Sequence, residues 1–416
     1  MTFKIITLGC KVNIYESEVM KEKLLQAGFK ETIDNSDIVI INTCSVTNMA
    51  DVKSRKMIRR EKKENPQSIL AVCGCSAENH RLELEDLGID ILIGNKDKSN
   101  IVSLIREYQN GHKPIIKFYD TRKLPFEDME VDKFTSHTRG FIKIQDGCNN
   151  YCSYCIIPYV RGNIRSKDIN VALKEAQELV ANNHKEIVLT GIHTGSYGVG
   201  YDFDLVDLIN KMSTIPGLKR IRLSSIEITE LNDKFMELLK NNTILCDHLH
   251  IPLQSGSEKI LKLMNRKYDK SRYESIINQI RAIRPEISIT TDVIVGFPGE
   301  TESDFNECLD FCRKIKYAKI HVFPYSKREG TKAASMPNQL DNKTKKDRAR
   351  KLIELSNELE EAYNQKFLGR NMDVLVEEYK DSCSIGHTSN YLKVVIETKV
   401  PTNEFYNVKI TKTSSS

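Results

Sequence analysis

The chain lacks any long apolar run, and no stretch approaches the ~18 residues needed to cross a membrane. The first residues, MTFKIITLGC, contain no basic segment before an apolar stretch and no small-residue cleavage site, so they indicate a first β-strand and not a secretory signal. An apolar content of 40% and a charged content of 29% are ordinary for a soluble globular protein. We therefore expect a cytoplasmic protein that enters no membrane and that folds into about two to three domains.

A strong excess of charge of one sign is also missing. The formal net charge of +5 over 416 residues favours a polyanionic partner only weakly and decides nothing alone. The 11 cysteines are an odd number, and in a reducing compartment they do not suggest a disulfide framework. Clustered cysteines in such a protein more often indicate metal binding or catalysis.

From Phe3 to about Tyr119, β-rich runs alternate with amphipathic stretches such as ESEVMKEKLLQAGF and NIVSLIREYQ. The β-rich runs are FKIITL, DIVIIN, SILAVC, IDILIG and PIIKFY. This alternation predicts a doubly wound parallel α/β domain over residues 1–120. The polar segment that follows, TRKLPFEDMEVDKFTS, is typical of a linker, which we place at residues 121–136.

A second βα alternation begins near Arg139, with the strand candidates GFIKIQ, EIVLTGI, RIRLSSIE, DHLHIPLQ, SITTDVIVGF and KIHVFPY. Six βα units in succession predict a partial, open (β/α)6 barrel over residues 137–366, with its functional side chains at the carboxyl ends of the strands. The final runs DVLVEE, YLKVVIE and YNVKIT predict a small all-β domain, a β-barrel, over residues 367–413.

Three cysteines, Cys148, Cys152 and Cys155, stand close together just after the first strand of the predicted barrel. Thiolates at this spacing can hold an iron-sulfur cluster. Zinc is the alternative, but it usually needs a fourth Cys or His nearby, and none follows in IIPYVRGN. A cluster with three protein ligands leaves one iron open for a small molecule.

The segment CNNYCSYC resembles the radical S-adenosylmethionine superfamily, whose signature is CxxxCxxC after the first barrel strand. The resemblance implies that the open iron binds the amino and carboxyl groups of S-adenosylmethionine. It also implies that one electron from the cluster cleaves a carbon-sulfur bond to give a 5'-deoxyadenosyl radical.

Three further cysteines follow three strands of the first domain. Cys10 comes after FKIITL, Cys44 after DIVIINT and Cys75 after SILAVCG. The carboxyl edge of a parallel sheet is where such folds bind ligands, so we expect these thiols to lie at one edge. Cys73 continues the apolar run of its strand, and we expect it to be a buried core thiol.

The segments TLGCKVNIYES, INTCSVTNMADVKSR and CGCSAE resemble the methylthiotransferase branch of that superfamily. The resemblance implies that Cys10, Cys44 and Cys75 hold a second 4Fe-4S cluster that takes part in sulfur insertion. It also implies that the last segment is a TRAM-like RNA-binding domain. The chain departs from the family in GCSAE, where an aromatic residue and Gln commonly follow the third Cys.

Within that branch, GCKVNIYES is similar to the enzymes that act on N6-threonylcarbamoyladenosine in tRNA. The isopentenyladenosine enzymes more often have GCQMN, and those that modify an aspartate of a ribosomal protein have GCPKN. Lys11 and Val12 therefore carry much of this substrate prediction.

Four residues are candidates for the S-adenosylmethionine site. Gly191 matches the family glycine motif for the amino group, although a plain turn is the alternative. Glu227 could accept hydrogen bonds from ribose hydroxyls or could be a solvated surface residue. Tyr154 would lie against the adenine. Gly296, with Gly299, would let the backbone approach the nucleoside closely.

Other positions are weaker candidates for polar or RNA contacts. Gln254 and Ser255 end the fourth strand. Arg161 and Arg165 could meet phosphate or the threonyl carboxylate, although exposed arginine is usually only solvated. The basic stretch from Lys343 to Lys351 could contact RNA or form a solvated helix face. The aromatic residues of the last segment could stack on bases or fill its core, and they are Tyr391, Phe405 and Tyr406.

The sequence thus predicts an enzyme that methylthiolates C2 of N6-threonylcarbamoyladenosine at position 37, next to the tRNA anticodon. The resemblance implies two 4Fe-4S clusters, S-adenosylmethionine as cofactor and methyl donor, and an electron donor such as flavodoxin or ferredoxin. One alternative is the same chemistry on N6-isopentenyladenosine or on a ribosomal protein aspartate. Another is a metal-stabilised RNA-binding protein without catalysis.

Overall fold

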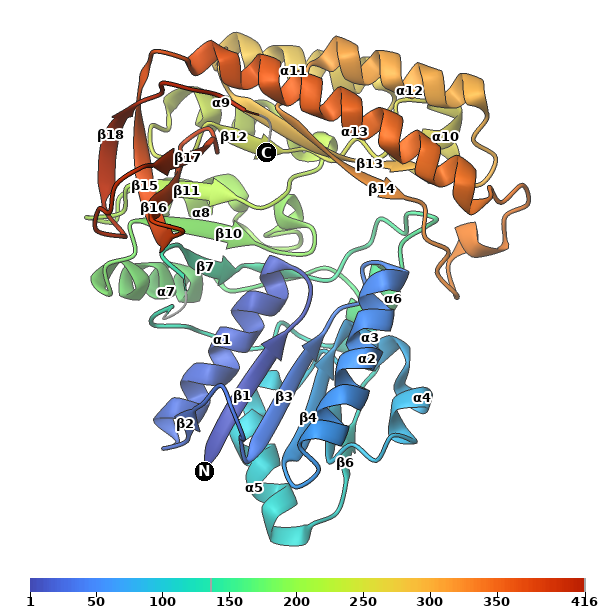
Figure 1. The fold of residues 1–416 in the computed structure, drawn as a ribbon, viewed down its shortest axis with the longest axis vertical. Helices are drawn as coiled ribbons and strands as arrows, with labels where there is room; N and C mark the ends of the chain where they lie inside the picture. Colours follow the sequence, from blue (N-terminus) through green and yellow to red (C-terminus); the bar gives the residue numbers. More distant parts are fainter. Residues whose placement is uncertain (135–136, 415–416) are drawn as a thin grey trace.

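The structure is a computed structural model that describes residues 1–134 and 137–414. The chain forms two lobes, with the N-terminal sheet in one and the central and C-terminal elements in the other (Figure 1). The long helix α13 (Asn342–Asn364) runs along the strands β13 and β14 at the far side of the second lobe (Figure 1).

The N-terminal lobe is built on one six-stranded parallel sheet with the order β2-β1-β3-β4-β5-β6. Its strands are β1 (Thr2–Thr7), β2 (Lys30–Glu31), β3 (Ile38–Thr43), β4 (Ile69–Gly74), β5 (Ile91–Ile93) and β6 (Ile115–Lys117). The order reverses at β1, and the crevice between β1 and β3 at such a reversal is where open α/β sheets bind ligands.

Helices cover both faces of this sheet, as the predicted doubly wound arrangement requires. The covering helices are α1 (Lys11–Gln26), α2 (Asn48–Glu64), α3 (Cys75–Asn79), α4 (Arg81–Glu85) and α5 (Ile101–Gly111). Ile38 and Ile40 of β3 pack with α1 and α5, whereas Val39 and Ile41 pack with α2, α3 and α4. A strand buried on both faces gives the continuous apolar run DIVIIN of the sequence.

The central region contains two three-stranded parallel sheets, with the orders β11-β10-β7 and β12-β13-β14. These strands are β7 (Gly140–Lys143), β10 (Glu186–Thr190), β11 (Arg220–Leu223), β12 (His248–His250), β13 (Ser288–Val295) and β14 (Lys319–Pro324). A parallel bridge between Ile221 and Leu245 joins the two sheets. The six predicted strands are therefore present and run parallel in sequence order. A short hairpin of β8 (Gln145–Asp146) and β9 (Arg165–Ser166) was not predicted.

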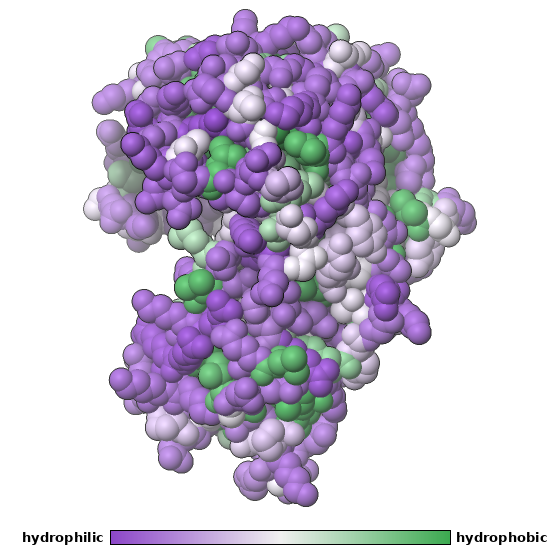
Figure 2. Space-filling model, turned by 90° about the vertical axis from the view of Figure 1, so that its right-hand side faces the viewer, coloured by the Kyte–Doolittle hydropathy of each residue, from purple (hydrophilic) through white to green (hydrophobic). Residues whose placement is uncertain are grey.

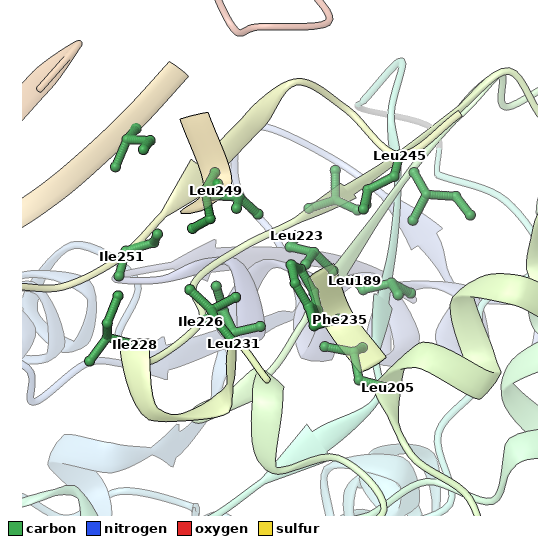
Figure 3. Close-up of a cluster of buried hydrophobic side chains, with 14 of the residues drawn as sticks. Leu189, Leu205, Leu223, Ile226, Ile228, Leu231, Phe235, Leu245, Leu249 and Ile251 are labelled. Atoms are coloured by element: carbon green, nitrogen blue, oxygen red, sulfur yellow. The ribbon is translucent and has the colours of Figure 1, made fainter. Parts of the chain in front are cut away.

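One large apolar core lies between these strands and their helices. The helices that contribute to it are α7 (Ile169–Ala181), α8 (Leu205–Met212), α9 (Asp233–Asn241), α10 (Glu258–Leu263), α11 (Lys270–Ile283), α12 (Glu302–Ile315) and α13. The short helix α6 (Ile157–Arg161) packs instead in a separate cluster with Cys75. Leu189 and Leu223 project from neighbouring strands toward Phe235 of α9 and Leu205 of α8 (Figure 3). This packing leaves Arg222, on the other face of β11, to point away from the core cluster.

The C-terminal segment is an antiparallel sheet of four strands in the order β17-β16-β15-β18. The strands are β15 (Asn371–Lys380), β16 (Cys383–Thr388), β17 (Lys393–Ile396) and β18 (Phe405–Lys409). Three of them coincide with the predicted runs, and β16 was missed. The predicted closure into a barrel is not present in the part of the chain that the structure describes, because β17 and β18 remain the two outer strands.

The predicted linker packs against its surroundings over its described part, residues 121–134. Met129, Val131 and Phe134 belong to the large central core. Tyr15 of α1 donates a hydrogen bond to the carbonyl oxygen of Met129 at 2.7 Å. The polar composition of the segment therefore gave no sign that three of its residues are buried in the core. Residues 135–136 of the predicted linker lie outside the described residues.

The surface is mainly hydrophilic, with scattered apolar groups on the face shown in Figure 2. Among the described residues, none of the helices combines the length and apolar character that a membrane crossing requires.

Candidate metal centres and cofactor site

Cys148, Cys152 and Cys155 lie in one loop between β8 and α6, and all three are partly exposed. Backbone hydrogen bonds hold this loop in shape. The N–H of Cys148 donates to the carbonyl oxygen of Gly162 at 3.0 Å, and that of Ser153 donates to Met264 at 3.0 Å. The second contact ties the loop to the end of α10, so residues far apart in sequence determine where the thiols stand.

Polar donors surround two of these sulfur atoms. Nη1 of Arg266 donates to Sγ of Cys152 at 3.3 Å, and the backbone N–H of Asn150 donates to Sγ of Cys148 at 3.5 Å. Cationic and N–H donors aimed at sulfur favour thiolates and cluster-bound sulfur. The loop therefore has the electropositive surroundings that bound thiolates need.

His193 lies beside the same loop. Its Nδ1 is 3.9 Å from Sγ of Cys148, and its Nε2 forms an ion pair with Oε1 of Glu230 at 2.6 Å. Burial alone would lower the pKa of His193, but hydrogen bonds with Cys148 and Glu230 outweigh it and raise that pKa to about 10. In the metal-free chain, His193 is therefore a cation at neutral pH.

The sequence suggested that Glu227 ends a strand. The structure differs, because β11 stops at Leu223. Glu227 forms an ion pair with Arg266 instead of pointing freely into solvent. The side chain of Arg266 is 4% exposed, and its guanidinium also lies over the ring of Tyr268, 5.0 Å from the ring centroid. A small pocket lined by Cys152, Glu227, Arg266 and Tyr268 opens at this point. Glu227 thus lies beside the first cysteine loop, which is where the predicted cofactor role requires it.

The other three predicted cofactor residues have defined surroundings. Tyr154 is partly buried and packs with a small apolar cluster that includes Phe297. Gly191 follows β10, and a Cβ there would lie 2.9 Å from Oε1 of Gln145. Gly296 follows β13, and a Cβ there would lie 2.5 Å from Cγ of Lys345 in α13. Both glycines therefore permit close packing within the chain itself.

The second set of cysteines lies at the carboxyl edge of the N-terminal sheet. Cys10 precedes α1, Cys44 follows β3, and Cys75 is the first residue of α3. Gly74 has φ +101°, and a Cβ there would lie 2.4 Å from the carbonyl oxygen of Thr43, so only glycine fits. A Cβ on Gly9, the residue before Cys10, would lie 2.5 Å from Sγ of Cys44, so the chain beside Cys10 closely approaches the Cys44 thiol.

Cys73 is a core residue, as predicted. It is 1% exposed and packs with Phe3, Ile38 and Ile40 on the face of the sheet covered by α1 and α5. Its thiol contacts Oδ1 of Asn42 at 3.7 Å, on the face away from the apolar cluster that contains Cys44.

Arg161 joins the N-terminal sheet to the first cysteine loop. It lies in α6, beside α3 (Figure 1), and its Nε donates to Sγ of Cys75 at 3.1 Å. Its Nη1 forms ion pairs with Glu16 at 2.9 Å and with Asp146 at 3.1 Å. All of these groups are buried, so the interface carries a charge network and not only apolar contacts.

The same network contains two lysines that pair with Glu16, namely Lys143 at 2.8 Å and Lys98. Burial alone would raise the pKa of Glu16, but Arg161, Lys143 and Lys98 outweigh it and hold that pKa well below its usual range. Asp146 behaves in the same way, and its pKa also lies well below the usual value.

The predicted substrate contact of Arg161 is therefore wrong, whereas that of Arg165, which is partly exposed, stays a prediction. Arg161 is fully buried and every branch of its guanidinium is bonded within the protein. Arg165 pairs with Asp146 at 3.1 Å. Sequence reasoning treated both as exposed arginines, because nothing local in the sequence shows that Asp146 folds back on them or that Glu16 of the N-terminal domain reaches Arg161.

The donor chemistry of both cysteine sets fits an iron-sulfur cluster better than a single ion. Among residues 1–134 and 137–414, no three His, Cys, Asp or Glu side chains converge closely enough to hold one metal ion. Thiolates of a four-iron cluster bind different irons, so they stand further apart than the ligands of one zinc ion. Burial raises the pKa of Cys44 and of Cys155 to about 12, and metal binding would have to displace the protons of these thiols.

The aromatic residues of the C-terminal sheet are engaged within the protein. The guanidinium of Arg222 lies 4.5 Å from the ring centroid of Tyr391, and that of Arg220 lies 4.6 Å from that of Phe405. Tyr406 packs against the small core of the sheet. These contacts favour the packing alternative for all three residues over base stacking.

The remaining candidates are also explained by packing. Ser255 is buried, and Gln254 has φ +66° and forms a bridge with Val293. In the basic stretch of α13, Arg348 is buried in an ion pair with Glu300 at 2.7 Å, while its other basic residues are more exposed. The stretch is therefore partly an anchor for the helix and partly a solvated face.

Sequence reasoning missed Arg266 and His193, which lie closest to the first cysteine loop. Neither belongs to a motif with characteristic spacing, and their role appears only when α10 and the loop after β10 meet the cysteines. An exposed pair of aromatic rings, Tyr151 and Tyr159, was also missed, with ring centroids 5.8 Å apart.

Comparison with known proteins agrees with this geometry. Residues 142–312 match the Radical SAM superfamily, and residues 2–94 match the Uncharacterized protein family UPF0004. The chain is 41% identical to the threonylcarbamoyladenosine tRNA methylthiotransferase MtaB of Bacillus subtilis (strain 168), over 98% of this chain and 93% of the relative. It is 36% identical to the tRNA-2-methylthio-N(6)-dimethylallyladenosine synthase of Clostridium tetani, over 100% of this chain and 94% of the relative.

Solved structures with low sequence identity share the fold. The radical S-adenosylmethionine methyltransferase TsrM of Kitasatospora setae superposes with a TM-score of 0.58 at 14% identity, over 80% of this chain and 76% of that chain. The cobalamin-dependent radical enzyme OxsB superposes with a TM-score of 0.52 at 13% identity, over 87% of this chain and 56% of that chain. From the near full-length identity to methylthiotransferases, the chain belongs to the radical S-adenosylmethionine methylthiotransferase family and is an enzyme of that family.

Proposed function

We propose that this enzyme adds a methylthio group to C2 of N6-threonylcarbamoyladenosine at position 37 of tRNA, next to the anticodon. The observation that carries the proposal is the pair of cysteine sets, which lie in two domains whose contact includes the hydrogen bond from Arg161 to the Cys75 sulfur. Relatives named for the threonylcarbamoyl substrate are 36–41% identical to the chain. Membership of the family does not by itself identify the substrate, because a relative named for the dimethylallyl substrate is also 36% identical to the chain.

In this proposal Cys148, Cys152 and Cys155 hold the cluster that binds S-adenosylmethionine, in a partial barrel formed by the six parallel strands. Cys10, Cys44 and Cys75 hold the auxiliary cluster. When bound, the first cluster supplies the electron that cleaves S-adenosylmethionine, and the second takes part in sulfur insertion. An electron donor such as flavodoxin or ferredoxin completes the system.

The protein residues near the first cysteine loop orient one another and balance the charge of the site. Arg266 sets the position of Glu227 through their ion pair and donates to the Cys152 sulfur. Glu227, so placed, can accept hydrogen bonds from ribose hydroxyls. Tyr154 lies within the same loop, and Gly191 lies against Gln145 of β8. His193 adds a positive charge at Cys148. Together they keep net charge low at a site where several thiolates gather.

The direct test uses anaerobically reconstituted enzyme, a chemical reductant, S-adenosylmethionine and tRNA substrates that carry threonylcarbamoyladenosine or isopentenyladenosine. We expect about eight irons per chain, and the methylthio product only on the threonylcarbamoyl substrate. Mass spectrometry of nucleosides measures the product. A product on the isopentenyl substrate alone would assign the enzyme to the isopentenyladenosine branch. Zinc in place of iron would refute the cluster assignment.

A further inference from the structure

Two exposed tyrosine rings stand together at the first cysteine loop. Tyr151 lies within that loop and is 41% exposed, and Tyr159 lies in α6 and is 53% exposed. Their ring centroids are 5.8 Å apart, and their planes cross at 79°. Two large rings in contact leave a patch of aromatic surface in water, which is a candidate contact surface for a partner. We call these two residues the tyrosine pair.

The backbone at Tyr151 is strained, with φ +46°. Bulky side chains rarely adopt this left-handed conformation, and it persists only where the surrounding structure enforces it. Nδ2 of Asn265 donates to the carbonyl oxygen of Tyr151 at 3.0 Å and to that of Asn150 at 3.3 Å. Oγ of Ser153 donates to the carbonyl oxygen of Leu263 at 2.7 Å. These contacts from the end of α10 hold the loop in a shape that leaves the Tyr151 ring at the surface.

Tyr159 is held by the turn Thr121–Lys123, which packs against α6. Oγ1 of Thr121 donates to the carbonyl oxygen of Tyr159 at 3.4 Å. Just after α6, Nδ2 of Asn163 donates to the carbonyl oxygen of Arg122 at 3.0 Å. The second ring of the pair is therefore fixed from a different part of the chain than the first.

Basic side chains flank the tyrosine pair on both sides. Nζ of Lys267 donates to Oδ1 of Asn265, the residue that holds the cysteine loop, at 2.9 Å. Lys123 ends the turn that packs against α6, where Arg122 pairs with Asp120 at 3.0 Å. Both lysines are exposed, and neither forms an ion pair among the described residues. Exposed rings between unpaired cations suit single-stranded RNA, whose bases stack on aromatic rings and whose phosphates are anionic.

The tyrosine pair also borders the proposed cofactor pocket. Asn150 and Asn265 line that pocket together with Cys152. Asn265 is also the residue that holds the backbone of Tyr151. A base stacked on Tyr151 would therefore lie beside the place where the radical is proposed to form, as a neighbour of the reacting nucleoside must.

We propose that the tyrosine pair stacks on an unpaired base of the anticodon loop, next to the nucleoside at position 37. The inference rests on the proposed function and names the part of the tRNA that this surface takes. Aromatic side chains recognise the splayed bases of single-stranded loops, whereas an RNA duplex presents its backbone and minor groove. Lys123 and Lys267 meet the phosphates on either side of that base.

The test uses reconstituted full-length protein and anticodon-arm RNAs with threonylcarbamoyladenosine at position 37 and 2-aminopurine at the nucleotide on one side or the other. The fluorescence of 2-aminopurine falls when it stacks, so wild-type protein should quench it at one of the two places. Tyr151→Ala and Tyr159→Ala should each weaken RNA binding about tenfold and reduce the quenching. Tyr151→Phe should retain both, because stacking needs the ring and not the hydroxyl. Ile33→Ala, at an exposed apolar side chain after β2, should bind like the wild type.

Iron content shows whether each variant keeps its clusters. If Tyr151→Ala loses iron, the quenching by wild-type protein and the affinity of Tyr159→Ala, which lies outside the cysteine loop, decide the question. Wild-type binding without quenching at either place, or full RNA affinity in the alanine variants, would overturn the inference. Full affinity with loss of flavodoxin-driven but not chemically driven S-adenosylmethionine cleavage would assign the surface to the electron donor instead. The proposed function is judged separately by the methylthiolated product of the wild-type enzyme, which can form even if the tyrosine pair touches no base.

Discussion

Cys73 and Cys75 stand on either side of Gly74, and their surroundings differ completely. Cys73 faces the apolar cluster under α1 and α5, whereas the Cys75 sulfur meets the guanidinium of Arg161. The left-handed turn at Gly74 lets the chain leave the strand between them. A change of direction at one glycine therefore separates a core thiol from a proposed cluster ligand.

The first prediction uses this contrast. Cys73→Ala should keep the iron content of the reconstituted protein and lower the free energy of unfolding by about 1 kcal/mol, because it removes only a small buried group. Cys75→Ala should lose about half of the iron, since one of two clusters loses a ligand. Iron analysis and urea unfolding measure the two effects. Loss of iron in Cys73→Ala alone would reverse the assignment.

Arg161 carries the second prediction at the residue scale. Arg161→Met should lower the free energy of unfolding of the metal-free chain by about 3–5 kcal/mol, because it leaves the buried carboxylates of Glu16 and Asp146 with fewer partners. Arg55→Met, which removes a surface ion pair with Glu83, should cost about 1 kcal/mol or less. Urea unfolding compares them. Equal small effects would show that the network contributes little to stability.

At the element scale, the C-terminal sheet docks on β11 through arginines. Nη1 of Arg220 donates to the carbonyl oxygen of His387 at 3.0 Å, and its Nη2 donates to that of Asp373 at 2.7 Å. Phe405 of β18 covers the same guanidinium. The sheet is thus held by directional contacts as well as by its own small core.

The third prediction follows from this docking. Arg220→Ala should loosen the C-terminal sheet by about 1–3 kcal/mol, since two hydrogen bonds and a cation–π contact are lost. Limited proteolysis should then release the C-terminal fragment faster than from wild type. Tyr379→Ala, at an exposed side chain of β15, serves as the control and should leave the cleavage rate unchanged. An unchanged rate in Arg220→Ala would mean that other contacts dominate.

Sequence patterns located most strands within a residue or two, because buried parallel strands leave continuous apolar runs such as DIVIIN. They missed β16, CSIGHT, because its alternately buried positions are Ser384, Gly386 and Thr388, which are not apolar residues. They singled out Cys148, Cys152 and Cys155 by their local spacing, and Cys10, Cys44 and Cys75 by their common position after three strands; their role as ligands stays a prediction. They could not find Arg266 or the partners of Arg161, because ion pairs between distant elements depend on tertiary structure.

At the scale of the whole molecule, buried charges join the N-terminal sheet to the central region. Besides the network at Arg161, Nη2 of Arg328 pairs with Oδ2 of Asp51 at 2.6 Å, and both side chains are at most 5% exposed. Such pairs hold their geometry only while both partners stay charged and excluded from water. The relative placement of the two lobes should therefore depend on pH.

The fourth prediction gives the direction. The folded-state pKa values of Glu16, Asp146 and Asp51 are lowered, so the unfolded chain binds more protons than the folded chain as pH falls. The stabilisation is present at neutral pH and should be lost progressively below about pH 5. Urea unfolding of the metal-free protein across this range measures it. Glu16→Gln should weaken the dependence of the free energy of unfolding on pH. An unchanged dependence would show that other groups cause the acid sensitivity.

The fifth prediction concerns removal of the C-terminal segment. Truncation before Phe367 would remove a side chain that is 1% exposed and would leave Arg220 and Arg222 without their backbone acceptors. The shortened protein should therefore have a lower thermal midpoint than full-length protein. Loss of tRNA affinity in that variant would not by itself show an RNA contact. An unchanged midpoint would show that the segment is thermodynamically independent.

The contact between Arg161 and the Cys75 sulfur has a consequence for inheritance. The Cys75 thiol of the N-terminal domain accepts a hydrogen bond from the Arg161 guanidinium of the central domain. Arg161 lies in the short helix α6, which follows the cysteines of that central domain. Neither domain can then be replaced by that of a distant relative unless the arginine and the cysteine of this contact are transferred together. Gene fusions that recombine these two domains should fold well only when one domain supplies the arginine and the other supplies the cysteine that it contacts.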